Sequence, residues 1–162
     1  MRILGIDPGL QVCGYACLEI NEGEEKLIEA GVCRTSGSLP LEAKLNQIAE
    51  DIQSLLKKFS PDTVAVEELY SHYAHPKTAI LMGHARGVIL QSCAEAAIEV
   101  RSFSATRIKK SITGNGRASK QQMQRAIQGI LSLPDVPEPN DVADAISVAL
   151  CCANSRVSYS VA

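Results

Sequence analysis

The sequence predicts an α/β fold in which one mixed β-sheet is flanked by helices. Two observations support this class: three consecutive strand-like segments open the chain, and helical and strand-like segments alternate after them. A length of 162 residues is typical of one domain, so we expect residues 1–162 to form a single domain. Hydrophobic residues make up 46% of the chain and charged residues 21%, which indicates folding around a core.

Three strands are predicted at the N-terminus. Residues 2–7 form a short apolar run that ends at a Pro-Gly turn, which is typical of a buried strand. Residues 12–20 and 27–34 are further strand-like segments, and an acidic turn at residues 21–25 connects them. Consecutive strands joined by short connections favour an antiparallel meander.

Helical spacing begins at residue 41. Residues 41–59 carry a stripe of Leu and Ile side chains on one helical face. Two further strands, at residues 62–69 and 98–103, enclose a long helix at residues 77–97. Three more helices are predicted at residues 104–110 with Ser104 as the cap, at residues 119–133, and from Asn140 or Asp141 to about residue 154. The predicted order is therefore β-β-β-α-β-α-β-α-α-α.

The composition excludes several classes of protein. No segment approaches the ~18 consecutive apolar residues of a membrane helix. Asp7 also falls where a signal peptide would carry its apolar stretch, so we expect a cytoplasmic protein without a membrane partner. The six cysteines show neither CxxC spacing nor a zinc-like arrangement with histidine. We therefore expect them to be reduced thiols in the core.

The net charge of −2 conceals an uneven distribution of charge. Residues 100–134 contain seven Lys and Arg residues and no Asp or Glu, whereas the rest of the chain contains nine basic and eighteen acidic residues. A basic segment inside an acidic chain favours a surface that binds a polyanion such as a nucleic acid. The alternative is an ordinary solvated helix face, and charge alone leaves both open.

Acidic residues stand where predicted elements begin or end. Asp7 ends the first strand, and Glu67 and Glu68 end the fourth. Asp141 and Asp144 share one face of an otherwise apolar final helix. Carboxylates gathered at one sheet edge would raise one another's pKa, and a divalent cation would remove that repulsion. Oxygen donors without Cys or His suit Mg²⁺ or Mn²⁺.

Each of these acids also has a structural explanation that the sequence leaves open. Asp7 before Pro-Gly could be a turn residue. Asp141 could cap its helix, and Asp144 could be a first-turn acid that the helix dipole favours. Glu67 and Glu68 could be surface acids.

Five motifs, in the same order and over nearly the whole chain, resemble those of the RuvC Holliday-junction resolvases. They are GIDPG with GYA at residues 5–9 and 14–16, AVE at 65–67, MGHARG at 82–87, GNGRASK at 114–120, and DVADA at 141–145. The resemblance implies an RNase H-like fold with a five-stranded sheet in the order 3-2-1-4-5. It also implies a homodimeric endonuclease that nicks two opposing strands of a four-way DNA junction during recombination and repair.

The resemblance further implies roles for particular residues. Two Mg²⁺ ions per active site, replaceable by Mn²⁺, would be held by four metal-binding and catalytic acids: Asp7, Glu67, Asp141 and Asp144. The expected DNA-binding residues are Tyr70 at the junction centre, Lys109 and Lys120 on the DNA backbone, and Arg117 from the same basic segment. The branch-migration proteins RuvA and RuvB are implied as partners.

The chain departs from the family pattern at two points near these motifs. Residues 70–78, which include His72 and His75, are one residue longer than the common pattern, so the resemblance leaves open how this segment contacts the junction core. His84 stands where the family usually carries Gln. No role is predicted for these three histidines.

Three other functions are considered. A phosphotransferase of the actin and sugar-kinase type shares the strand-Asp-x-Gly turn but needs a second lobe, for which 162 residues are too few. An RNase H-like nuclease of the YqgF type would act on a different nucleic acid. A non-catalytic junction-binding protein would have no need of all four acids.

Overall fold

The computed structural model describes residues 1–69 and 76–157. In this part of the chain the strands are β1 (Arg2–Asp7), β2 (Val12–Asn21), β3 (Glu24–Arg34), β4 (Thr63–Glu67) and β5 (Glu99–Phe103). The helices are α1 (Leu41–Phe59), α2 (Pro76–Glu95), α3 (Ala105–Thr113), α4 (Lys120–Ile130) and α5 (Asn140–Val157). Their order along the chain is the predicted one.

The five strands form one mixed sheet in the order β3-β2-β1-β4-β5, which confirms the expected topology. The first three strands are antiparallel neighbours, whereas β4 and β5 continue the sheet in parallel with β1. The turn between β2 and β3 is shorter than predicted because Glu22 and Gly23 both have positive φ, at 53° and 90°. Such a turn joins two strands within two residues.

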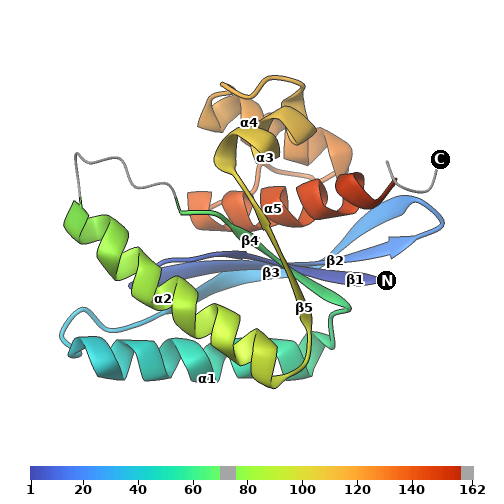
Figure 1. The fold of residues 1–162 in the computed structure, drawn as a ribbon. Coiled ribbons are helices and arrows are strands. Elements are labelled where there is room, and N and C mark those ends of the chain that lie inside the picture. Colours follow the sequence, from blue (N-terminus) through green and yellow to red (C-terminus); the bar gives the residue numbers. More distant parts are fainter. Residues whose placement is uncertain (70–75, 158–162) are drawn as a thin grey trace.

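Helices cover both faces of the sheet (Figure 1). Helices α1 and α2 lie on one face, and α5 lies on the other with α3 and α4 packed beyond it. Because side chains alternate along a strand, the same two strands supply both cores. Leu4 and Val64 point into the core beneath α1 and α2, whereas Ile3 and Ala65 point into the core beneath α5.

Several helix ends differ from the predictions by two or three residues, and those of α3 and α4 have clear structural reasons. The predicted helix 119–133 ends at Ile130, because Ser132 has φ 50° and turns the chain. Leu131 and Leu133 still pack on the core, so the apolar spacing continues past the helix itself. The predicted helix 104–110 extends to Thr113, where Gly114 ends it with φ 75°. Its predicted cap is confirmed, since the Ser104 side chain accepts a hydrogen bond from the backbone N–H of Arg107.

Two expectations about composition can be compared with the structure. All six cysteines are free, and five of them are buried, as expected for core thiols. Among the described helices, none combines the length and the apolar character that a membrane span requires.

Candidate active site

Two acids lie side by side where neighbouring strands end. Strands β1 and β4 are parallel and paired in register, so Asp7 and Glu67 reach the same edge of the sheet. Both are at odd positions that face α5, like the buried Ile3 and Ala65 of their strands. The next residue, Glu68, is exposed, and its backbone N–H donates a hydrogen bond to the carbonyl oxygen of Phe103 at 2.9 Å.

Helix α5 carries Asp141 and Asp144 to the same edge. It begins where β4 leaves the sheet (Figure 1) and packs across β1, β2 and β4. The helix approaches the strands closely because glycines lie beneath it: a Cβ on Gly14 would collide with the backbone carbonyl oxygen of Asp141, and one on Gly5 with that of Ala145. Gly14 is the register partner of Asp7, so the close contact between Gly14 and Asp141 brings Asp141 toward Asp7.

The four acids Asp7, Glu67, Asp141 and Asp144 are hereafter called the acid cluster. They interact electrostatically, because the charges of the other three all act on Asp7. Burial, together with the charges of Asp144, Glu67 and Asp141, raises the pKa of Asp7 to about 8. Burial and the charge of Asp144 raise the pKa of Glu67. Burial also raises the pKa of Asp144, to which the charge of Asp141 contributes. The cluster therefore holds more negative charge than its surroundings compensate.

Two lysines from the basic segment lie beside the acid cluster. Lys109 on α3 and Lys120 at the start of α4 both lower the pKa of Glu67 and of Asp144. Lys120 also lowers the pKa of Asp7. The two lysines and the two carboxylates face a common hollow of about 190 Å³, lined by Glu67, Ala105, Lys109, Lys120, Met123 and Asp144.

A second hollow adjoins the first on the side of α2. It measures about 220 Å³ and is lined by Asp7, Pro8, Glu67, Glu68, Leu69, Ala79, Met82 and Ala105. Glu67 and Ala105 line both hollows, so Glu67 lies between them, with Asp144 in the first hollow and Asp7 in the second. A polyanion that crosses this edge of the sheet would meet acids in the middle and lysines on one side.

The acid cluster fits a hard divalent cation by the chemistry of its donors. It offers carboxylate oxygens only, and oxygen ligands are what Mg²⁺ and Mn²⁺ prefer. The raised pKa values of Asp7 and Glu67 reflect burial first and then repulsion between the acids, and a bound cation would offset that repulsion. Within residues 1–69 and 76–157, no three acidic, histidine or cysteine side chains already surround one point as a metal cage. The described acids thus interact electrostatically but do not form a closed metal cage.

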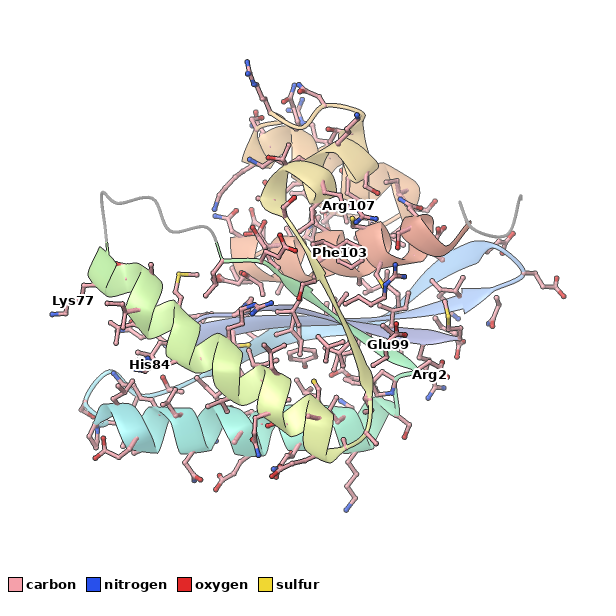
Figure 2. The ribbon with its side chains drawn as sticks, in the orientation of Figure 1. Arg2, Lys77, His84, Glu99, Phe103 and Arg107 are labelled. Carbon is pink, nitrogen blue, oxygen red and sulfur yellow. The ribbon has the colours of Figure 1, made fainter. Side chains whose placement is uncertain are left out.

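Arg117, the other described residue of the expected DNA-binding set, is not brought to the acid cluster. Arg117 is exposed between α3 and α4 and lines neither hollow. Tyr70 lies outside the described residues, as do His72 and His75. His84 is exposed on α2, across the sheet from α5 (Figure 2), and its Nδ1 lies 3.1 Å from the carbonyl oxygen of Ile80.

Sequence reasoning missed that Lys109 and Lys120 lie beside the acids. It expected them only as contacts to the DNA backbone. A signal was present for Lys109, because α3 follows β5 directly and β5 ends beside β4 in the parallel sheet. Figure 2 shows this junction at Phe103, where Arg107 from α3 lies 5.0 Å from the ring centroid.

Comparisons with known proteins agree over almost the whole chain. Residues 3–152 match the family model described as crossover junction endodeoxyribonuclease RuvC. A RuvC of this description from Rhodopirellula baltica is 45% identical over 99% of this chain and 92% of its own. One from Caldicellulosiruptor saccharolyticus is 41% identical over 98% of this chain and 97% of its own.

Solved structures give the same result. The RuvC structure from Thermus thermophilus superposes with a TM-score of 0.88 at 29% identity, covering 98% of this chain and 97% of that one. T. thermophilus RuvC in complex with a Holliday junction substrate gives a TM-score of 0.87 at 26% identity, covering 97% and 96%. A yeast mitochondrial Holliday junction resolvase, at 14% identity over 98% of this chain and 81% of its own, shares the fold with a TM-score of 0.67.

Proposed function

Because this chain belongs to the RuvC family of crossover junction endodeoxyribonucleases, we propose that the acid cluster is its catalytic centre. The chain is an endodeoxyribonuclease that resolves Holliday junctions. Matches of 41–45% identity over nearly the whole chain favour this activity over a YqgF-type nuclease or a phosphotransferase. The presence of all four acids favours an active enzyme over a non-catalytic junction-binding protein.

We assign the acid cluster as the site of two Mg²⁺ ions, for which Mn²⁺ would substitute. When bound, the ions would activate a water for attack on the scissile phosphate and stabilise the leaving 3′-oxygen. The part of the acids is to supply oxygen ligands and to stay ionised. Lys109 and Lys120 support this, because their charges lower the pKa of Glu67 and Asp144.

The same lysines are suited to bind the DNA backbone next to the reacting phosphate. Lys120 is exposed and Lys109 half-buried, so their ammonium groups are accessible at the edge of the hollow. We assign both to phosphate binding, which positions DNA without reading its sequence. Arg117 and Tyr70 complete the proposed DNA-binding set; Arg117 is exposed within the same basic segment.

A homodimer is proposed through the exposed face of α2. Ile80 is 60% exposed on this face, and Gly83, His84, Gly87 and Gln91 continue the same side of the helix, which carries Lys77 near one end and Glu95 at the other. A Cβ on Gly83 or Gly87 would meet nothing within 4 Å, so a second helix could approach closely. A two-fold dimer supplies the two matched sites that two cuts require.

Three further proposals come from the sequence. We propose that residues 1–162 act as a single nuclease domain, which the shared five-stranded sheet supports. The action of RuvA and RuvB on the same junction and a cytoplasmic location are proposed from the family resemblance and the sequence.

The observation that most directly supports the catalytic proposal is the electrostatic interaction of the four acids at one edge of the sheet. The test is cleavage of a mobile synthetic four-way junction with Mg²⁺, Mn²⁺, Ca²⁺ or EDTA. We expect paired nicks with Mg²⁺ and Mn²⁺. With Ca²⁺ we expect binding without cleavage, because Ca²⁺ is larger and accepts looser coordination. Full cleavage in EDTA would contradict the metal assignment.

A further inference from the structure

Arg86 on α2 makes two hydrogen bonds to the ends of neighbouring strands. Its Nε donates to the backbone carbonyl oxygen of Glu67 at 3.2 Å, and its Nη2 donates to Ser102 Oγ at 2.8 Å. Glu67 is the last residue of β4, and Ser102 is the last but one of β5. Among the described residues the guanidinium forms no ion pair, so its charged donors serve a carbonyl and a hydroxyl.

The held carbonyl belongs to the residue that carries a catalytic carboxylate. The ladder between β4 and β5 ends at the pair Glu67 and Phe103, and the chain then leaves the sheet. The bond from the Glu68 N–H to the Phe103 carbonyl continues past this pair. Arg86 therefore adds a second restraint, from another element, at the point where the sheet stops fixing the backbone.

The position of Arg86 is itself fixed by packing. Its neighbour Ala85 on α2 is fully buried in the core between this helix and the sheet, and Ile89 one turn later is also fully buried. The guanidinium is half-buried and spans β4 and β5 from a helix that cannot shift without opening this core. The cations that lower the pKa of Glu67 are Lys109 and Lys120, so Arg86 is not needed to account for the charge balance of this carboxylate.

We propose that Arg86 is a positioning residue that, by bridging Glu67 and Ser102, holds the end of β4 so that the Glu67 carboxylate stays within the acid cluster. The proposal rests on the catalytic role of Glu67 proposed above. A displacement of about 1 Å at a catalytic group can reduce a rate by about 100-fold. Arg86 would act on the reaction without touching DNA or metal.

The variants chosen to test this proposal distinguish the hydrogen-bonding geometry of Arg86 from its charge. Arg86→Gln removes the bridge and the charge, whereas Arg86→Lys keeps the charge but lacks the planar fork that reaches two acceptors. Ser102→Ala removes one of the two bonds. Arg2→Gln is the matched control, because Arg2 Nη1 also donates to a backbone carbonyl, that of Phe59 at 3.1 Å, at the opposite end of the sheet.

The first readout is kinetic. We expect Arg86→Gln and Arg86→Lys to lower kcat on a four-way junction by about 10- to 100-fold, with junction affinity in Ca²⁺ unchanged. Ser102→Ala should give a smaller loss of the same kind, and Arg2→Gln should keep the wild-type kcat even where it lowers thermal stability. Full rescue by Arg86→Lys would overturn the proposal, because charge would then suffice. A loss of junction affinity equal to the loss of kcat would also overturn it.

The second readout does not depend on cleavage. Hydrogen exchange of the backbone amides in residues 64–69, measured without metal or DNA, should be faster in Arg86→Gln than in the wild type and unchanged in Arg2→Gln. Unchanged exchange in Arg86→Gln would overturn the positioning role. If the wild type itself failed to cleave junctions, the proposed function would fail, while the exchange experiment would still decide whether Arg86 holds this strand end.

Discussion

Gly14 on β2 lies directly beneath the backbone carbonyl of Asp141 on α5. A Cβ on Gly14 would collide with that oxygen and would lie 3.2 Å from the Asp141 Cβ. Because Gly14 is also the register partner of Asp7, it sets the distance between Asp7 and the helix that carries Asp141 and Asp144. The spacing of the acid cluster therefore depends on a residue without a side chain.

Replacing this glycine should separate the acids. We expect Gly14→Ala to lift α5, to cost about 1–3 kcal/mol of stability as overpacking does, and to reduce cleavage by about 100-fold. Thermal unfolding and junction cleavage measure the two effects. Gly129→Ala on α4 is the control, because a Cβ there meets nothing within 4 Å. It should keep full activity and gain stability, since Ala favours a helix. Equal cleavage activity in Gly14→Ala and Gly129→Ala would contradict the proposal that the close contact between Gly14 and Asp141 sets the spacing of the acids.

The raised pKa of Asp7 predicts how stability depends on pH. In EDTA, the folded state keeps a proton on Asp7 up to about pH 8, whereas the unfolded chain releases it near 3.8. Stability should therefore fall as pH rises between these values, because the folded state binds more protons there. Asp7→Asn should lack this part of the slope and be more stable than wild type at pH 8, by several degrees in Tm. Identical pH slopes for both proteins, measured by thermal unfolding, would contradict the shift.

Lys120 should influence the pH dependence of cleavage as well as DNA affinity. Its charge lowers the pKa of Asp144, Asp7 and Glu67, so Lys120→Gln should raise these pKa values. Since the ionised acids are the active form, the acidic limb of the pH–rate profile should move to higher pH. The slope of log affinity against log salt should also fall by up to about one. Arg117→Gln should change the affinity and leave the acidic limb in place; a shift in both variants would argue against a local effect of Lys120.

The proposed dimer face gives a prediction about assembly. Ile80→Glu introduces a charge on the exposed face of α2 and should produce a monomer that remains folded. Paired cutting should fall with dissociation, because each copy holds one acid cluster. Ile130→Glu is the control, since Ile130 is also an exposed Ile, 43% accessible, on α4. Sedimentation at micromolar concentration distinguishes the two; a dimeric Ile80→Glu variant would place the interface elsewhere.

Much of the fold followed from local patterns. Apolar runs ending at turns located β1 and β4, and the spacing of Leu and Ile located α1, because these signals lie within each segment. The end of the helix near residue 130 was predicted too late, because Leu131 and Leu133 contribute to the core without being helical.

The candidate site was only partly predictable. Strand ends and a three-residue spacing pointed to Asp7, Glu67, Glu68, Asp141 and Asp144, and the family resemblance selected Glu67 over Glu68; the charges of Glu67, Asp141 and Asp144 all act on Asp7 in the structure. The closeness of Lys109 to these acids, and the bond from Arg86 to Glu67, join segments far apart in the chain. Such contacts depend on how helices pack on the sheet, which no local pattern encodes.

The pair Glu67 and Glu68 offers the most direct test of the catalytic assignment. Both follow Val66 and differ in the face that they occupy: Glu67 lies in the acid cluster with a raised pKa, and Glu68 is exposed. The measurement is the cleavage rate of a four-way junction in Mg²⁺ by Glu67→Gln and Glu68→Gln, with junction affinity measured in Ca²⁺. We predict that Glu67→Gln binds the junction normally and does not cut it, and that Glu68→Gln retains substantial activity. An active Glu67→Gln variant, or an inactive Glu68→Gln variant beside it, would contradict the account.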